Sequence, residues 1–119
     1  MPELPEVETV RRDLEEALKG AVILKVDVLG RTSVVGPEKA FRSALAGSRF
    51  TSFGRRGKLL LFGLDLKDGR NVTLAVHLRM TGQLIHVSKV AQQVAPLHQV
   101  NSLTRVVLHV GDGGIILFN

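Results

Sequence analysis

The chain has 119 residues, a length that suits one domain with its own hydrophobic core. Hydrophobic residues make up 45% of it and charged residues 23%, as in globular proteins, and no apolar run approaches the roughly 20 residues needed to cross a bilayer. The absence of cysteine excludes disulfides and thiolate metal sites and suits a reducing compartment. The acidic start lacks the basic and apolar regions of a secretory signal, so we expect a cytoplasmic protein without membrane contact.

The charge is unevenly distributed along the chain. Sixteen basic and 11 acidic residues give a formal charge of +5, which favours a polyanionic partner. Residues 1–16 contain six acids against two arginines, whereas residues 49–79 contain seven bases against two acids, so the positive charge lies in the middle of the chain. The four histidines have no metal-ligand spacing, and we predict no metal; they are His77, His86, His98 and His109.

Two helices are predicted, over residues 5–19 and 37–46. Pro5 suits the first position of the first helix, and Gly20 ends it. The apolar stripe of this helix consists of Val7, Val10, Leu14 and Leu18. Its opposite charges four residues apart pair Glu8 with Arg12 and Glu15 with Lys19.

The remaining chain has the pattern of short strands and turns. Strands are expected on both sides of Gly30 within residues 21–35, and over residues 49–53, 59–66, 72–78, 83–87, 103–110 and 115–118. Turns are expected over residues 54–58, 67–70 and 111–114, and a loop over 88–102. The predicted fold is mainly β, a two-sheet antiparallel sandwich or flattened barrel with the two helices at its flanks.

Pro2 and the carboxylates that follow it form the first candidate site. If Met1 is removed, Pro2 becomes a secondary amine that can attack a sugar aldehyde and form an iminium. An α-amino group titrates near about 8, so more of it is unprotonated at neutral pH than of a lysine. Glu3 and Glu6 could transfer protons as general acid and base. The structural alternative is that the proline stiffens the start of the helix while the acids complement its dipole.

Two later segments are candidates for binding an anion. Residues 54–58, Gly-Arg-Arg-Gly-Lys, place glycines beside three cations, so that a backbone can approach a phosphate; basic turns are also often only solvated. Residues 77–82, His-Leu-Arg-Met-Thr-Gly, interrupt the strand pattern. Methionine usually fills a core, but Met80 on a protruding turn could wedge into the gap that a displaced base leaves.

Together these segments resemble the formamidopyrimidine-DNA glycosylases, relatives of endonuclease VIII. The resemblance rests on three motifs in the same order, at residues 1–12, 55–62 and 77–82. It implies the N-terminal catalytic domain of that family over residues 1–119, a two-sheet β-sandwich with helices. Leu4 favours the formamidopyrimidine branch, because the endonuclease VIII branch usually has glycine there.

The resemblance also implies roles for individual residues. Pro2 is the nucleophile at C1′ of the damaged nucleoside, Glu3 is the acid/base, and Glu6 supports the proton relay. The implied catalytic set is Pro2, Glu3, Glu6 and Lys58. The implied DNA-binding set is Arg55, Arg56, Lys58, His77 and Met80, in which Lys58 and His77 grip phosphates and Met80 fills the space of the flipped nucleotide.

The implied function is base excision repair of damaged double-stranded DNA by a monomer in the cytoplasm or nucleoid. A bifunctional glycosylase/AP lyase would remove oxidised purines, such as 8-oxoguanine and formamidopyrimidines, through a proline Schiff base with β- and δ-elimination. Two alternatives stay open. One is an oxidised-pyrimidine glycosylase like endonuclease VIII, and the other is a non-catalytic DNA-binding module on the same scaffold.

The chain departs from the family pattern in several places. Asn119 precedes the family's next turn, whose arginine and phenylalanine complete the void-filling set, and the family's helix-two-turn-helix and cysteine zinc finger are missing from this sequence. Arg79 replaces a common glycine, and residues 101–104 replace a basic stretch. We therefore expect a domain cut from a longer protein, with weak DNA binding alone and no cofactor of its own.

Overall fold

The computed structural model of the chain describes residues 4–30, 33–78, 82–94, 104–111 and 113–119. Its elements in chain order are α1 (Leu4–Leu18), β1 (Ile23–Val28), α2 (Glu38–Leu45), β2 (Arg49–Arg56), β3 (Leu59–Asp65), β4 (Asn71–His77), β5 (Leu84–Val87), α3 (Lys89–Val94), β6 (Val106–Val110) and β7 (Ile115–Phe118).

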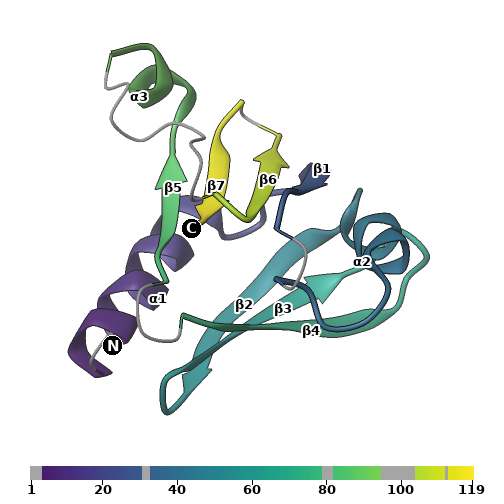
Figure 1. The fold of residues 1–119 in the computed structure, drawn as a ribbon, viewed down its shortest axis with the longest axis horizontal. Coiled ribbons are helices and arrows are strands. Elements are labelled where there is room, and N and C mark those ends of the chain that lie inside the picture. Colours follow the sequence, from purple (N-terminus) through teal and green to yellow (C-terminus); the bar gives the residue numbers. More distant parts are fainter. Residues whose placement is uncertain (1–3, 31–32, 79–81, 95–103, 112) are drawn as a thin grey trace.

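The strands form two antiparallel sheets with a shared core between them (Figure 1). One sheet has the order β1-β6-β7-β5 and the other the order β2-β3-β4. Every strand pair is antiparallel, and neither sheet closes on itself among the described strands. The predicted sandwich is therefore confirmed, and the fold is not a closed barrel.

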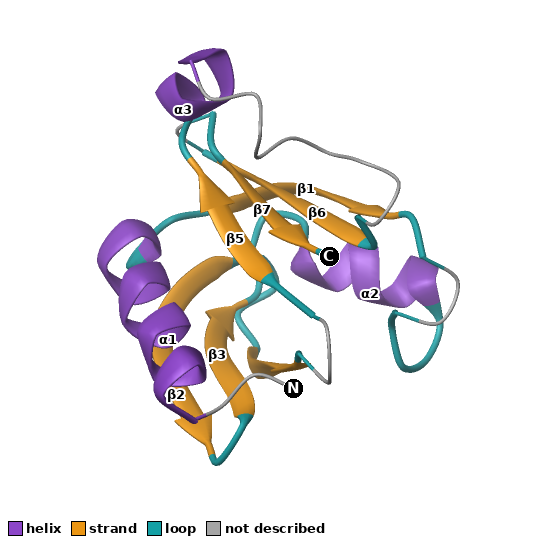
Figure 2. Ribbon diagram, turned by 60° about the vertical axis from the view of Figure 1, so that its left-hand side comes forward, coloured by secondary structure: helices purple, strands orange, loops and turns teal. Residues whose placement is uncertain are grey.

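The two predicted helices are confirmed to within one residue at each end. They lie at opposite sides of the sandwich (Figure 2). α1 packs against β2 and β5, one edge strand from each sheet, and α2 packs against β1. α1 therefore connects the two sheets along one side, with its N-terminus at the end of the domain.

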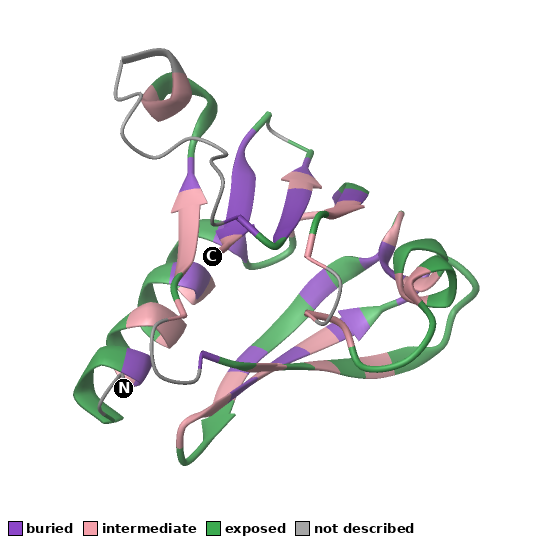
Figure 3. Cartoon of the chain, viewed as in Figure 1, coloured by how far each residue is buried: buried purple, intermediate pink, exposed green. Residues whose placement is uncertain are grey.

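The core lies between the sheets and beneath α1. The predicted stripe of α1 enters it, because Val7, Leu14 and Leu18 are all at most 3% exposed. Three phenylalanines of β2 and β3 pack against one another, with ring centroids 5.5–6.1 Å apart; they are Phe50, Phe53 and Phe62. Buried residues also dominate β6 and β7 (Figure 3). Buried and half-buried residues alternate along β3, whereas β6 and β7 are buried along almost their whole length.

Part of the predicted loop over residues 88–102 is wrong, because Lys89–Val94 form a third helix. Ser88 caps this helix by accepting a hydrogen bond at Oγ from the backbone N–H of Ala91, at 3.1 Å. Residues 95–102 of the predicted loop lie outside the described residues. The sequence contained the signal, a serine followed by good helix formers.

The second strand predicted between Gly30 and Val35 is also wrong for its described part, since residues 33–36 form bends. β1 ends at Val28, opposite the first residue of β6. Beyond it the backbone N–H groups of Leu29 and Gly30 both donate to the carbonyl of Arg105, at 2.6 and 3.0 Å. This shared acceptor turns the chain away from the sheet. None of the described helices is long and apolar enough to cross a membrane.

Candidate functional site

The start of α1, the β2–β3 turn and the end of β4 gather at one end of the domain. Arg55 near the end of β2 bonds Glu8 on α1, from Nε to Oε1 at 2.9 Å. Leu59, the first residue of β3, pairs with His77, the last residue of β4. Figure 1 shows the N-terminus of α1 and the tip of the β2–β3 hairpin at the same end. The fold thus unites the neighbourhoods of the three sequence motifs.

The β2–β3 connection is tighter than the predicted turn over residues 54–58. β2 continues to Arg56, which pairs with Leu59, so the loop contains only Gly57 and Lys58. Gly57 has a φ of +60°, the left-handed conformation that two-residue hairpin loops require. The five-residue turn is therefore a wrong prediction, and half-buried Lys58 lies at the hairpin tip.

Strand alternation separates the two arginines that precede this tip. Arg55 pairs with the fully buried Leu60 and so faces the core side, where α1 lies. Arg56 pairs with Leu59 and shares the outer face with His77. The Arg56 guanidinium is exposed and makes no hydrogen bond or ion pair with any described residue. Arg56 is the cation of this pair that is open to an outside anion.

Glu8 is the centre of an ionic cluster at this end. Its carboxylate accepts hydrogen bonds of 2.8–2.9 Å from Arg11, Arg12 and Arg55, which confirms the predicted Glu8–Arg12 pair. Glu15 pairs with Arg11 at 3.3 Å instead of with Lys19, whose side chain has no ion pair with a described residue. The sequence could not reveal Glu8–Arg55, because these residues are 47 positions apart.

The cluster changes the acid–base properties of its members. Hydrogen bonds from Arg11, then from Arg55, hold the pKa of Glu8 well below its usual range. The same bonds to Glu8 raise the pKa of Arg11. Glu8 is therefore ionised at neutral pH.

Several predicted site residues lie outside the described part of the chain. Pro2 and Glu3 directly precede α1, and Glu6 is exposed in its first turn. Met80 also lies outside the described residues, but both flanks of its segment are fixed, because the N–H of Gly82 donates to the carbonyl of Leu78 at 2.7 Å. A side chain at Gly82 would overlap that carbonyl. The roles of these residues stay predictions.

A cleft of about 830 Å³ lies beside this end, lined by residues from strands of both sheets. Its described lining is mostly apolar, with contributions from Phe41, Leu74 and Phe118, and its titratable members are His77 and Arg105. This lining provides no carboxylate to work with the histidine as an acid–base pair. Among the described residues there is also no group of three or more acidic or histidine side chains that could hold a metal.

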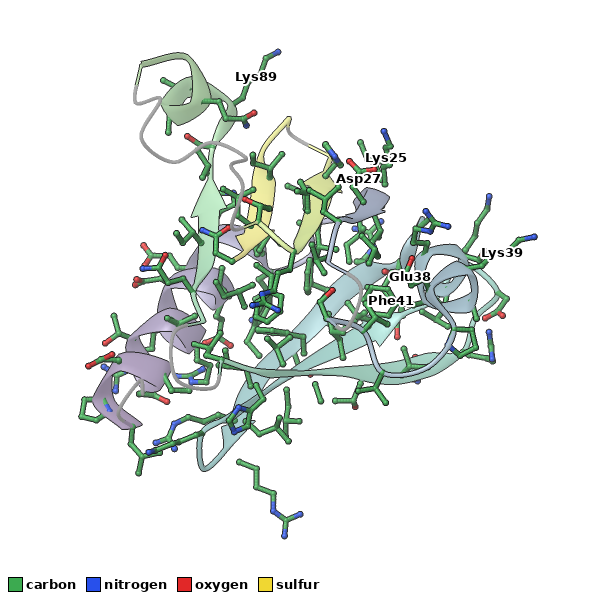
Figure 4. The ribbon with its side chains drawn as sticks, in the orientation of Figure 1. Lys25, Asp27, Glu38, Lys39, Phe41 and Lys89 are labelled. Atoms are coloured by element: carbon green, nitrogen blue, oxygen red, sulfur yellow. The ribbon has the colours of Figure 1, made fainter. Side chains whose placement is uncertain are left out.

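A second charged cluster, which the sequence did not predict, lies away from this end. Nε2 of His109 on β6 is 2.8 Å from Oδ2 of Asp27 on β1, and Lys25 is 3.6 Å from the other carboxylate oxygen. Figure 4 shows Lys25 and Asp27 side by side, far from the start of α1. Asp27 and His109 are 82 residues apart, so only the β1–β6 pairing brings them together.

Comparison with protein families gives one match that spans the whole chain. The family model described as "Formamidopyrimidine-DNA glycosylase N-terminal domain" matches residues 1–119. The formamidopyrimidine-DNA glycosylase of Pelotomaculum thermopropionicum is 42% identical over 114 residues, which cover 94% of this chain and 40% of that protein. The enzyme of the same name from Desulforamulus reducens is 41% identical over 120 residues, which cover 99% and 39%.

Solved structures agree with these relatives. Wild-type Lactococcus lactis Fpg (MutM) in complex with DNA containing N7-benzyl-Fapy-dG matches with a TM-score of 0.81 and 29% identity, covering 98% of this chain and 39% of that one. MutM in complex with DNA containing carbocyclic 8-oxo-G matches with a TM-score of 0.79 and 29% identity, covering 98% and 40%. The chain thus spans about two fifths of the proteins that it matches.

Proposed function

The chain belongs to the formamidopyrimidine-DNA glycosylase N-terminal domain family, and from this membership we propose that it forms the catalytic part of a base excision repair DNA glycosylase. The observation that carries the proposal is the match over all of residues 1–119, which includes the N-terminal proline motif. The position of α1 beside the basic hairpin supports it, because the first turn of α1 and the candidate phosphate-binding residues then share one end of the domain.

Oxidised purines in double-stranded DNA are the proposed substrate. Support comes from the relatives' names and from neighbouring structures whose DNA contains a Fapy-dG derivative or an 8-oxo-G analogue. Leu4, which lies in the first turn of α1, agrees with this branch of the family.

The proposed reaction begins at the nitrogen of Pro2 after removal of Met1. Its lone pair attacks C1′, the bond from C1′ to the base breaks, and the base leaves with the bonding electrons and takes up the proton that the Pro2 nitrogen loses. Glu3 protonates the sugar oxygen as the ring opens and the iminium forms, with Glu6 supporting the relay. The Glu3 carboxylate, now deprotonated, takes a proton from C2′, and the electrons of that C–H bond expel the 3′ phosphate. Loss of a second proton, from C4′, then expels the 5′ phosphate.

The DNA contacts proposed for the basic end follow from exposure and charge. Arg56 and His77 share the outer face, and Lys58 lies at the tip of the hairpin between them. Cations there would bind phosphates on both sides of a flipped nucleotide, while Met80 would fill the space that it leaves. Arg55, also predicted to bind DNA, has its guanidinium on Glu8.

Borohydride trapping tests the reaction. The protein as its gene encodes it, with loss of Met1 checked by intact mass, should form a covalent adduct with duplex DNA that contains an abasic site. Pro2→Gly should slow trapping strongly, whereas Pro5→Ala, which leaves the terminal amine in place, should retain it. No adduct with the processed wild type, or an equal trapping rate in Pro2→Gly, would exclude the proline mechanism. Binding to the same duplex without an adduct would instead indicate a non-catalytic module.

A further inference from the structure

We propose that Glu8 is a positioning residue for this reaction, because its bond to Arg55 holds the start of α1 against the β2–β3 hairpin. The inference rests on the proposed function, since it concerns the geometry of the same site. Its consequence is that Arg55 acts through Glu8 and not on DNA. The Glu8–Arg55 bond, together with the contacts of Arg55 to the hairpin turn, is called the clamp below.

The Glu8 carboxylate is fully engaged by arginines. Oε1 accepts from Nε of Arg55 and Nε of Arg11, both at 2.9 Å. Oε2 accepts from Nη2 of Arg11 and Nε of Arg12, both at 2.8 Å. These are charge-assisted bonds, and Arg11 binds both oxygens as a fork, which fixes the orientation of the carboxylate.

Arg55 is the member of this cluster that comes from another element. Its Nη1 also donates to the carbonyl of Gly57, at 3.2 Å, in the two-residue loop that contains Lys58. A continuous series of contacts therefore runs from Glu8 on α1, through the Arg55 guanidinium, to the residue before Lys58. Arg11 adds a second connection, because its Nη1 donates to the Phe53 carbonyl on β2 at 3.2 Å.

The clamp is partly shielded from water. The Glu8 and Arg55 side chains are 23% and 31% exposed, whereas that of Arg12 is 72% exposed. Arg12 and Glu8 both lie on α1, so their bond connects no second element. Arg12 is therefore a matched control for Arg55: it has the same chemistry and the same acceptor but does not bridge to the hairpin.

The position of the clamp along α1 gives it a role that core packing does not fill. Apolar contacts of Val7, Leu14 and Leu18 hold the helix on the core, but they are non-directional. Hydrogen bonds at Glu8 fix the rotation and axial position of the helix one turn after Leu4. A displacement of about 1 Å of a reacting group can cost roughly 100-fold in rate. Proton transfer by Glu8 itself is disfavoured, since the three arginines keep it ionised.

A double-mutant cycle tests the clamp in the protein as its gene encodes it. The variants are Glu8→Gln, Arg55→Gln, the double variant and the control Arg12→Gln. Each is assayed by single-turnover borohydride trapping on abasic-site duplex, which separates the rate constant of the active molecules from their fraction, and by the Kd for the same DNA. A loss of folded protein lowers the fraction, whereas misplacement lowers the rate constant.

We expect Glu8→Gln and Arg55→Gln each to lower the rate constant about tenfold with Kd within about twofold, and the double variant to equal either single one. Arg12→Gln should stay within about twofold of wild type. An unchanged rate constant, a loss of active fraction only, or single effects that multiply in the double variant would overturn the positioning role. If the wild type forms no adduct, both this inference and the proposed function fail. If the wild type forms the adduct and the Glu8 and Arg55 variants form it equally fast, only this inference fails and the proposed function stands.

Discussion

Arg55 and Arg56 are neighbours in the sequence, and their side chains leave β2 on opposite faces. Arg55 lies on the side of α1, 2.9 Å from Glu8, and Arg56 lies on the outer face with His77. Both were predicted from the sequence to bind DNA. The fold distinguishes them, because a guanidinium that already neutralises a carboxylate releases few counterions when DNA binds.

Substitution of the two arginines should therefore affect the salt dependence of DNA binding differently. Arg56→Gln should make the negative slope of log K against log salt shallower by about 0.9, which corresponds to the loss of one phosphate contact. Arg55→Gln should leave the slope unchanged. Fluorescence anisotropy with a lesion-containing duplex over a salt series measures both. Arg49→Gln, which removes an exposed arginine at the far end of β2, is the control. Equal slope changes in the Arg55 and Arg56 variants would contradict the assignment.

Gly82 should not tolerate a side chain. Its Cβ would overlap the carbonyl of Leu78, a backbone group that accepts the hydrogen bond from the Gly82 N–H and cannot move without breaking it. Gly82→Ala should lower the free energy of unfolding by about 1–3 kcal/mol and slow base excision. Urea unfolding measures the first effect. Gly111→Ala is the control, since its Cβ would meet only the Val22 carbonyl, at an ordinary 3.8 Å; similar losses in both variants would exclude the steric explanation.

Phe62 in β3 should contribute strongly to the stability of the core. It is 2% exposed, and its ring meets those of Phe50 and Phe53 edge-on at 6.1 and 5.8 Å. Phe62→Ala should lower the free energy of unfolding by about 3–5 kcal/mol. Val35→Ala removes a fully exposed side chain and should change it by less than about 0.5 kcal/mol. A loss below about 1 kcal/mol for Phe62→Ala, measured by urea unfolding, would contradict tight packing there.

Local pattern predicted most of the fold, and long-range pairing explains what it missed. The apolar stripe of α1 and the turns at Gly57 and Gly69, which both have positive φ, act within a few residues, so the first two helices and the hairpins could be predicted. The strand expected after Gly30 failed because a strand needs a partner, and β6 begins only at Val106, opposite Val28. The third helix was missed although Ser88 carried a capping signal, because its six residues are too few to show an apolar stripe at helical spacing.

The candidate site divides in the same way. The motif residues could be named from the sequence, since Pro2 and Lys58 carry their chemistry in their own side chains or termini. Glu8 could not, because its i,i+4 spacing to Arg12 explained its charge locally. The hydrogen bond between Glu8 on α1 and Arg55 on β2 depends on the packing of these two elements, which the sequence does not show.

The contact between Asp27 and His109 should make stability depend on acidic pH. The hydrogen bond with His109, together with the charge of Lys25, keeps the pKa of Asp27 below its ordinary 3.8 in the folded protein. Between the two values the unfolded chain binds more protons than the folded one, so stability rises with pH there. The contribution of Asp27 is therefore present above pH 3.8 and is lost as pH falls through the lower, folded-state pKa.

Asp27→Asn should remove this contribution. The difference in free energy of unfolding between wild type and Asp27→Asn should be largest well above pH 3.8 and should shrink as the solution is acidified below it. Urea unfolding at a series of pH values gives this difference directly. Asp13→Asn changes an exposed carboxylate on α1 that makes no hydrogen bond with a described residue, so its difference from wild type should stay small throughout. A difference for Asp27→Asn that does not vary with pH would show that the carboxylate's charge does not stabilise the β1–β6 pair.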